Sequence, residues 1–348
     1  MMLVRKCEFR NPFYLDSKDY NWMINQYKSV YDRSSLRVAE GIMERGSYRH
    51  GIKKRLFISL WNHAKYSESH FTLTKSSGDQ VRVAFDARNT QYHALYLERY
   101  KYGYEPEVTN FIDIVLSSKG GFCDIGANWG FYSLFVATKP GYSGKVHAFE
   151  PLKSSFQDLK SVVEGAGLGD RIDIHEMALS DHRGAGKMVI PDKLNSGLAV
   201  LIEEGKGGVT IGLLDELADK PHIIKVDAEG YEPEIISGGL GLISGSRPFI
   251  IFESNCNLSG VSQEPTSPSK QLQMYNILEK QGYLFFHPAW FVDDTYIPSN
   301  HALFLKGEKL LALKRFDSRE RFLHRDKFNC IACHESRLAE LTNNFEKR

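Results

Sequence analysis

A glycine-rich turn occupies residues 122–131, Phe-Cys-Asp-Ile-Gly-Ala-Asn-Trp-Gly-Phe, between a strand-like apolar run and a helical stretch. Such a turn brings backbone N–H groups and a helix N-terminus against a ligand. The turn has Gly126 and Gly130 but lacks the third glycine of the dinucleotide fingerprint, which argues against NAD because a closely packed pyrophosphate needs it. The spacing favours a ligand without phosphates, whose amino acid moiety is held by the loop and by an acid such as Asp124.

Two further strand-like segments end in residues that suit a nucleoside. Glu150 lies twenty residues beyond Gly130, where an acidic side chain is the expected acceptor for two ribose hydroxyls. The next segment ends at residues 177–181, Met-Ala-Leu-Ser-Asp, which places the backbone of Ala178 and Leu179 where an adenine ring is read. The Ser-Asp pair is also typical of a simple cap or turn.

The strongest acid-base candidates follow a fourth strand-like segment. Lys225, Asp227 and Glu229 alternate with apolar residues, so they share one face of a strand. Open parallel sheets bind ligands beyond the carboxyl ends of their strands, which points this face at the site. The alternative is an internal ion pair from Lys225 to an acid, which only locks the strand end.

These residues require a parallel sheet to bring them together. Strand-like and helical segments alternate from residue 121 onward, which is typical of a sheet covered by helices on both faces. The last two strands lack a long helix between them, so we expect an antiparallel hairpin at one edge. The expected strands are residues 121–125, 145–149, 172–178, 223–227, 249–253, 283–286 and 302–305, with an extra strand at 208–211 and short helices at 213–218 and 233–237.

The remaining sequence divides into flanking parts. Residues 1–70 read as a helical N-terminal extension, and residues 71–118 as a β-hairpin and a helix that lead into the main domain at 119–306. The last segment, 307–348, reads as a charged helical tail with apolar contacts such as Leu310 and Phe316.

Composition limits the class of protein. The 348 residues are 42% hydrophobic and 25% charged with a net charge of +1, which is ordinary for a soluble chain. No apolar run reaches the length of a membrane span, and the amino terminus turns charged before a secretory signal builds up. Five cysteines are too few for a disulfide framework, so we expect a reducing compartment.

The charge is uneven along the chain. Residues 1–60 hold 12 basic and 6 acidic side chains, residues 61–306 hold 22 and 30, and residues 307–348 hold 10 and 7. An acidic main domain argues against a protein that coats nucleic acid, because phosphate neutralisation needs a positive field there. The basic ends remain candidates for substrate or partner contacts.

Five motifs occur in order: Asp-Ile-Gly-Ala-Asn-x-Gly from Asp124, Ala-Phe-Glu-Pro around Glu150, Ala-Leu-Ser-Asp from Ala178, Lys-Val-Asp-Ala-Glu-Gly-Tyr-Glu from Lys225, and Phe-Glu at 252–253. This combination resembles the FkbM-type methyltransferases, which are S-adenosylmethionine-dependent enzymes with the seven-stranded, Rossmann-like α/β class I fold. The resemblance covers about residues 95–306 and leaves both ends outside it.

The resemblance implies methyl transfer to oxygen, commonly on sugars, glycolipids or polyketide-like products, in the cytoplasm. By motif, it places the cofactor loop at Asp124, Gly126, Ala127, Asn128 and Gly130. It makes Glu150 the ribose acid and places Asp181 in the adenine region. Asp227 and Glu229 match the family motif that follows the fourth strand.

Methyl transfer from a sulfonium is an in-line displacement, so the protein must align an oxygen and help its proton leave. Asp227 is the first candidate for the base or hydroxyl orienter, with Glu229 and Lys225 next. We expect no metal, although oxygens of Asp227, Glu253 and Asn255 offer an alternative divalent-ion site.

Two other functions compete with a methyltransferase that acts on a hydroxyl. A non-catalytic protein of the same fold is the first competitor, and a nucleic-acid methyltransferase is the second; the acidic main domain and the absence of an Asn/Asp-Pro-Pro-aromatic motif argue against the latter. The Cys330-x-x-Cys333-His334 pattern matches haem attachment, and with His324 it offers zinc ligands, but two cysteines in a tail helix are favoured. The identity of the acceptor and the oligomeric state, including a homodimer, stay open.

Overall fold

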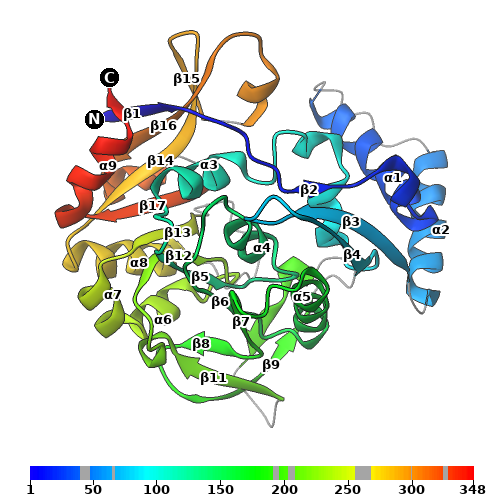
Figure 1. Cartoon of the computed structure of the whole chain (residues 1–348), viewed down its shortest axis with the longest axis horizontal. Coiled ribbons are helices and arrows are strands. Elements are labelled where there is room, and N and C mark those ends of the chain that lie inside the picture. The colour runs from blue at the N-terminus through cyan, green and yellow to red at the C-terminus, as the bar shows by residue number, and fades with distance from the viewer. Residues whose placement is uncertain are drawn as a thin grey trace.

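A central sheet of eleven strands organises the chain (Figure 1). The computed structural model describes residues 1–39, 48–64, 67–190, 196–202, 208–254, 268–298, 300–323 and 328–348. Two smaller sheets and the helices surround the central sheet, whose two halves differ in strand direction.

One half of the sheet is parallel. Its five strands stand in the order β7-β6-β5-β12-β13, and each neighbouring pair is parallel. This order confirms the predicted Rossmann-like α/β fold. The bounds are β5 (Gly121–Ile125), β6 (Val146–Phe149), β7 (Ile172–His175), β12 (Pro221–Val226) and β13 (Phe249–Ser254).

Both faces of these strands are buried, because successive residues belong to different apolar cores. Phe122 and Ile223 face a core shared with α3, α4 and α5, whereas Cys123 and Ile224 face a core shared with α6, α7 and α8. Continuous apolar runs in the strands follow from this double burial. The helices are α3 (Pro106–Val115), α4 (Phe131–Ala137), α5 (Lys153–Ala166), α6 (Glu232–Ser237), α7 (Leu240–Ser246) and α8 (Pro268–Lys280).

The other half of the sheet is antiparallel and is built from the two ends of the chain. It continues from β13 in the order β17-β14-β16-β1-β18, with β15 paired to β14. The bounds are β1 (Met2–Lys6), β14 (Tyr283–Val292), β15 (Thr295–Ile297), β16 (Lys309–Phe316), β17 (Phe328–His334) and β18 (Glu346–Lys347). Figure 1 places the two termini close together at this edge.

The helical tail predicted for residues 307–348 is wrong. Three segments of it are the strands β16, β17 and β18, and α9 (Leu338–Asn344) is the only α-helix among its described residues. Leu311 and Leu313 are buried against β1 and β14, so pairing in the sheet outweighs the helical reading of this apolar run. The expected edge hairpin of 283–286 with 302–305 is also wrong, since Asn300–Phe304 forms the short 3-10 helix η6 and β14 pairs with β16 and β17 instead.

The N-terminal part is helical as predicted, but it begins with a sheet strand. After β1 and β2 (Phe13–Tyr14), the helices α1 (Trp22–Ala39) and α2 (Tyr48–His63) lead to the predicted hairpin of β3 (Glu68–Thr74) and β4 (Gln80–Asp86). The strand β2 extends this hairpin to three strands.

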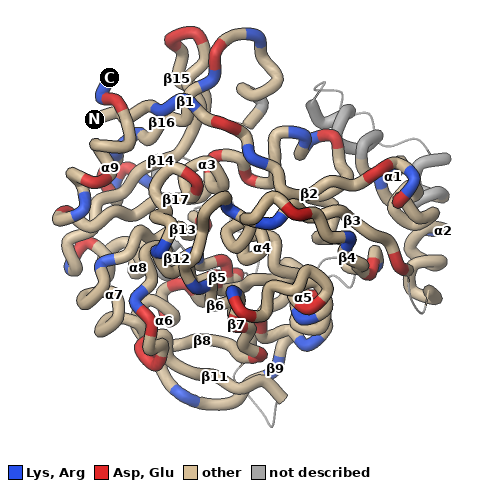
Figure 2. The backbone as a smooth tube through the Cα atoms, in the orientation of Figure 1, with Lys and Arg blue, Asp and Glu red and all other residues tan. Residues whose placement is uncertain are grey.

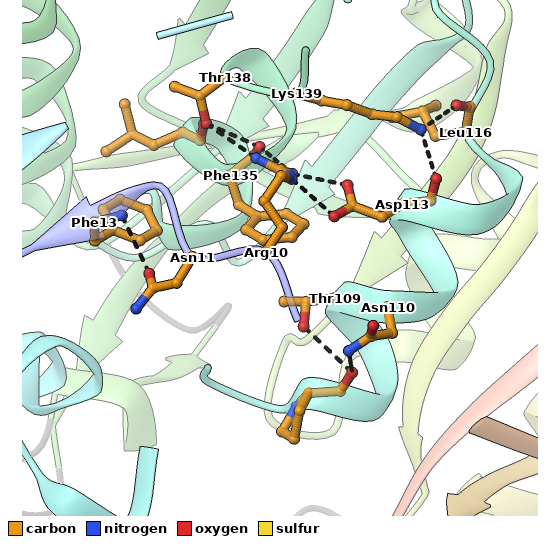
Figure 3. Close-up of polar contacts among 12 residues, drawn as sticks. Arg10, Asn11, Phe13, Thr109, Asn110, Asp113, Leu116, Phe135, Thr138 and Lys139 are labelled. Atoms are coloured by element: carbon orange, nitrogen blue, oxygen red, sulfur yellow. Dashed lines mark hydrogen bonds and ion pairs between the residues drawn. The ribbon is translucent and has the colours of Figure 1, made fainter. Parts of the chain in front are cut away.

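Arg10 ties the segment between β1 and β2 to the parallel half (Figure 3). Its guanidinium donates two hydrogen bonds of 2.8 Å to the Asp113 carboxylate on α3 and one of 2.7 Å to the Phe135 carbonyl on α4. It also lies 3.7 Å from the centre of the Phe135 ring. A bidentate, charge-assisted contact of this kind fixes geometry as well as adding stability.

A small sheet covers one end of the parallel strands. Its order is β10-β9-β11-β8, and it includes the predicted extra strand at 208–211. The helix expected at 213–218 is only a three-residue 3-10 turn, Leu214–Glu216. The strands are β8 (Ala178–Ser180), β9 (Gly184–Val189), β10 (Val200–Ile202) and β11 (Val209–Leu213).

Charged residues of both signs are interspersed along the described chain (Figure 2). Several basic residues near the ends are paired within the chain: Lys6 lies 3.2 Å from Glu308, and Arg337 lies 2.8 Å from Glu340. Among the described helices, none has the length and apolarity needed to cross a bilayer.

Candidate active site

A cavity of about 330 Å³ opens at the carboxyl ends of the parallel strands. Open α/β sheets bind their ligands at this end of their strands. Nine of the residues singled out from the sequence line it: Gly126, Ala127, Asn128, Glu150, Ala178, Leu179, Lys225, Asp227 and Glu229.

The turn after β5 depends on glycine for two separate reasons. Gly126 has φ +77°, and a Cβ there would lie 1.8 Å from the Asp227 carbonyl oxygen. Gly130 has φ +92°, and a Cβ there would lie 2.5 Å from a methyl carbon of Leu159. Both positions therefore disfavour a side chain by conformation, and Gly126 excludes one by space as well because its close contact is with backbone. The turn is held in place because the N–H groups of Gly126 and Ala127 donate to the Phe149 carbonyl at 3.0 Å.

Glu150 is buried at the end of β6, and each of its carboxylate oxygens accepts a backbone hydrogen bond. The N–H of Asn128 donates to one oxygen at 2.8 Å, and the N–H of Leu152 donates to the other at 2.8 Å. Burial raises the pKa of Glu150 to about 7, although these two hydrogen bonds act in the opposite direction. The N–H of Asn128 therefore links the glycine turn directly to the Glu150 carboxylate.

Lys225 and Asp227 form a buried ion pair, with Nζ and Oδ2 3.0 Å apart. The Lys225 side chain is only 4% exposed and lies 4.6 Å from the centre of the Tyr132 ring. Burial alone would lower the pKa of Lys225, but the nearby carboxylates of Asp227, Glu105 and Asp124 outweigh it and raise the pKa. Lys225 therefore forms the ion pair that the sequence offered as an alternative, and both partners line the cavity.

Glu232 fixes the loop that follows β12 through hydrogen bonds to its backbone. Its carboxylate accepts hydrogen bonds from the N–H groups of Ala228 and Gly230 at 3.0 Å. Glu229 has φ +48°, a conformation that non-glycine residues rarely adopt. Tyr231 anchors the other side of the loop, because its hydroxyl donates to the Leu201 carbonyl at 2.8 Å.

Three predicted site residues, Gly130, Asp124 and Asp181, do not line the cavity. Asp124 is buried under the turn, where one carboxylate oxygen accepts from the Ser133 hydroxyl at 2.7 Å and the other has no hydrogen-bond partner among the described residues. Burial raises the pKa of Asp124. Asp181 is largely exposed and lies 2.7 Å from the ring nitrogen of His182, because the chain turns outward after β8.

The sequence analysis missed a carboxylate beside Lys225. Glu105 lines the cavity at the start of α3, has φ +41°, and accepts a hydrogen bond from the hydroxyl of Tyr132. Its charge is the largest cause of the raised pKa of Tyr104. Glu105 precedes Pro106, which marks a helix start, but nothing in the sequence shows that this start faces the cavity.

A second cavity of about 450 Å³ adjoins the first. The two share Tyr100, Tyr104, Glu105 and Glu253 in their linings. The second cavity is completed by β14, η6 and β17, so the antiparallel half of the sheet supplies most of its far wall.

The alternative metal ligands find no support among the described residues. No group of three His, Cys, Asp or Glu side chains there is arranged to hold an ion, while Asn255 and His324 lie outside the described residues. Cys330 and Cys333 lie on β17, not in a helix, and face opposite apolar cores, so they cannot bind one ion together.

Fold and cavity together define a Rossmann-like α/β protein with a cavity at the carboxyl edge of its parallel strands. Comparison with family models adds the family: residues 124–285 match the methyltransferase FkbM domain. The matched residues include all five motifs, which confirms the resemblance drawn from them. No curated protein matches the sequence significantly.

Solved structures that resemble the chain in part include methyltransferase FkbM from Methylobacillus flagellatus KT, 18% identical with a TM-score of 0.37. That match covers 57% of this chain and 44% of the other, so this chain spans less than half of that protein's length. An O-methyltransferase from Bacillus cereus in complex with SAH is 15% identical over 66% of this chain and 87% of the other, with a TM-score of 0.37. A precorrin-6y C5,15-methyltransferase from Geobacter metallireducens is 12% identical over 67% and 88%, with a TM-score of 0.35.

Proposed function

We propose that the protein is an S-adenosylmethionine-dependent O-methyltransferase that acts on a hydroxyl of a sugar, glycan, glycolipid or natural product. One observation carries the proposal: the glycine turn, Glu150 and the Asp227 ion pair line one cavity inside the matched domain. Four described cysteines are free thiols, which suits the cytoplasm as the place of action.

The residues present fit the cofactor. Gly126 lets the turn pack directly against the Asp227 carbonyl at the edge of the cavity, and Glu150 would accept hydrogen bonds from the ribose hydroxyls. Ala178 and Leu179 would form the apolar side of the adenine site. Asp124 and Asp181 would act only indirectly, Asp124 through Ser133 beneath the turn.

When bound, S-adenosylmethionine supplies an electrophilic methyl carbon. The task of the chain is to orient the acceptor hydroxyl and to take its proton as the new bond forms. Asp227 is the residue we assign to this role, since its carboxylate lines the cavity and is held at a fixed position by Lys225. Glu229 on the same loop is the second candidate for the proton.

Titration calorimetry with S-adenosylmethionine and S-adenosylhomocysteine tests the central claim. We expect both to bind the full chain, and the absence of binding by either would refute the proposal. Glu150→Gln should weaken binding by about tenfold, because the amide replaces one hydrogen-bond acceptor with a donor that faces a backbone N–H.

Asp227→Asn separates binding from transfer. It should keep cofactor affinity within a few fold and lower the transfer of labelled methyl groups to a fractionated extract by about 100-fold or more. Asp170→Asn, at an exposed position outside both cavities, is the matched control and should change neither quantity. A fully active Asp227→Asn enzyme would remove Asp227 from the mechanism, and binding without any transfer would favour the non-catalytic alternative.

A further inference from the structure

Helices α1 and α2 carry a concentration of exposed apolar side chains at the edge of the molecule (Figure 1). Of the nine large hydrophobic residues that are exposed among the described residues, four lie on these two helices: Trp22, Ile52, Leu56 and Leu60. Single exposed apolar residues are common on protein surfaces, but a group of them marks an interaction site.

Three of these residues form a stripe along α2. Ile52, Leu56 and Leu60 are four residues apart, so they lie one above the other on one side of the helix. Phe57 and Trp61 lie on another side, where they are buried against α1. Packing on α1 therefore uses one apolar side of α2 and leaves the stripe exposed. A helix that is apolar on two sides is normally buried on both, which predicts a second apolar surface for α2 to bind.

The charge of α2 indicates the kind of surface. Its sixteen residues include four Lys or Arg and no Asp or Glu. One of the four, Arg55, is exposed and directly precedes Leu56 of the stripe. The sequence from residue 22 to residue 64 holds 8 basic and 3 acidic residues. A basic helix with an exposed apolar stripe is typical of binding to an anionic membrane surface.

Two other occupants fit the stripe less well. A two-fold contact between copies of the chain places the same patch of both copies face to face, so the basic helix α2 would meet itself and like charges would repel. Nucleic acid would match the charge, but Ile52, Leu56 and Leu60 are aliphatic and give the stripe no ring on which a base stacks.

We propose that α2 binds the surface of an anionic lipid bilayer. The helix would lie in the plane of the surface, with Ile52, Leu56 and Leu60 inserted at the boundary of headgroups and acyl chains and Arg55 near the lipid phosphates. The inference goes beyond the proposed methyl transfer and does not depend on it, because it concerns where the protein acts. The cytoplasmic face of a membrane carries anionic lipids, which suits the proposed place of action.

Vesicle sedimentation with the full chain tests the proposal. The probes are vesicles of phosphatidylcholine alone and vesicles of phosphatidylcholine mixed with phosphatidylserine, at physiological ionic strength. We expect the mixed vesicles to bind at least about tenfold more tightly than the neutral ones, because several basic residues of α2 meet an anionic surface. No binding to the mixed vesicles, or equal binding to both kinds, would overturn the proposal.

Two leucines with the same exposure separate the stripe from the rest of the surface. Leu60 on α2 and Leu305 just after η6 are both 51% exposed. Leu60→Glu should weaken binding to the mixed vesicles by about tenfold or more, because an anion replaces an inserted apolar side chain. Leu305→Glu makes the same change of charge and should leave the binding unchanged. Equal weakening by the two variants would reflect net charge alone and refute the role of the stripe.

Arg55→Gln tests the charge and leaves the stripe intact. It should weaken binding to the mixed vesicles by about fivefold, the effect of one basic residue close to an anionic surface. Unchanged binding would contradict the placement of Arg55 near the lipid phosphates. Because Leu60 and Arg55 are both exposed, we expect both variants to fold, and circular dichroism checks that their helix content equals that of the wild type.

Two further measurements keep the outcomes apart. A wild-type dimer that Leu60→Glu dissociates, in a chain that binds no vesicles, would assign the stripe to a second copy and overturn the proposal; analytical ultracentrifugation detects it. None of the described residues of α2 lines either cavity, so calorimetry should give the same affinity for S-adenosylhomocysteine in Leu60→Glu and the wild type. A loss of cofactor binding therefore bears on the proposed function, and a loss of vesicle binding on this inference alone.

Discussion

The parallel and antiparallel halves of the central sheet contribute to different cavities. The parallel half holds the glycine turn, Glu150 and Asp227, and it lies within the matched family domain except at its first residues. The antiparallel half takes β1, β16, β17 and β18 from outside the matched residues and supplies the far wall of the second cavity. Under the proposed function the cofactor would be bound by the matched domain, whereas the added strands line the adjoining cavity.

The added strands are integral parts of the central sheet. Strand β17 lies between β13 and β14, so the last part of the chain is inserted into the middle of the sheet. Its residues Cys330, Ile331, Ala332 and Cys333 are all fully buried. The antiparallel half therefore stabilises the parallel half and cannot be treated as a separable tail.

Truncation is the strongest way to break this comparison. Removing residues 328–348 deletes β17 and leaves the edges of β13 and β14 unpaired, so we expect insoluble or unfolded protein. Removing only 346–348 deletes the two-residue edge strand β18 and should cost about 1 kcal/mol or less. Solubility and circular dichroism of the two truncated chains give the answer; a folded chain without 328–348 would show that the tail is separable after all.

Gly126→Ala tests the parallel half alone. The new Cβ meets the Asp227 carbonyl at 1.8 Å, so the turn must move and we expect cofactor affinity to fall by about 100-fold. Gly141→Ala is the control, because Gly141 has a similar φ of +70° with no atom near the added carbon. It should cost about 1 kcal/mol of stability and leave the cofactor affinity unchanged. Equal affinities in the two variants, measured by calorimetry, would contradict the role of this contact.

Arg10→Met tests the link between the N-terminal segment and the parallel half. It removes the bidentate contact to Asp113, which is only 18% exposed, so we expect a loss of about 2 kcal/mol in the free energy of unfolding. Arg82→Met breaks the contact of a 61% exposed guanidinium with Asp19 and should cost about 0.5 kcal/mol. Denaturant unfolding of both variants measures the difference, and similar losses would mean that the Arg10 contact adds nothing special.

The sequence predicts the parallel half well because its signals are local. The strand over Gly121–Ile125 and the turn at Gly126 follow from apolar runs and glycine spacing within a few residues. The antiparallel half depends on pairing between residues about 80 or 300 apart in the chain, such as Ile251 with Ile331 and Leu3 with Leu313. Nothing local distinguishes such a strand from an apolar helix face, so the tail was misread as helical.

The same limit explains the site residues. Asp227 and Glu150 end strands of the parallel sheet, and that position alone directs them toward the cavity. Glu105 reaches the cavity through the tertiary placement of α3, and Asp181 leaves it because β8 belongs to the small sheet. Motif order therefore locates the candidate site, but not the residues that other elements bring to it or turn away from it.

The smallest predicted effect concerns the charge of the second cavity and is measured as stability against pH. Glu107 has a pKa of about 7 in the folded protein, above the value of about 4.3 for an unfolded chain. Between these values the folded state binds more protons than the unfolded state, so raising the pH through this window lowers stability. Glu107→Gln carries no such proton, and its stability relative to the wild type should rise by about 1–2 kcal/mol between pH 5 and pH 8.

Glu98→Gln, at a 72% exposed carboxylate, should follow the wild type across the range. Because Glu150 also has a raised pKa, the wild type and the variant share a remaining slope, and only their difference reports on Glu107. Parallel curves for wild type and Glu107→Gln would show that burial and the charge of Glu105 do not raise the pKa of Glu107 in the folded protein.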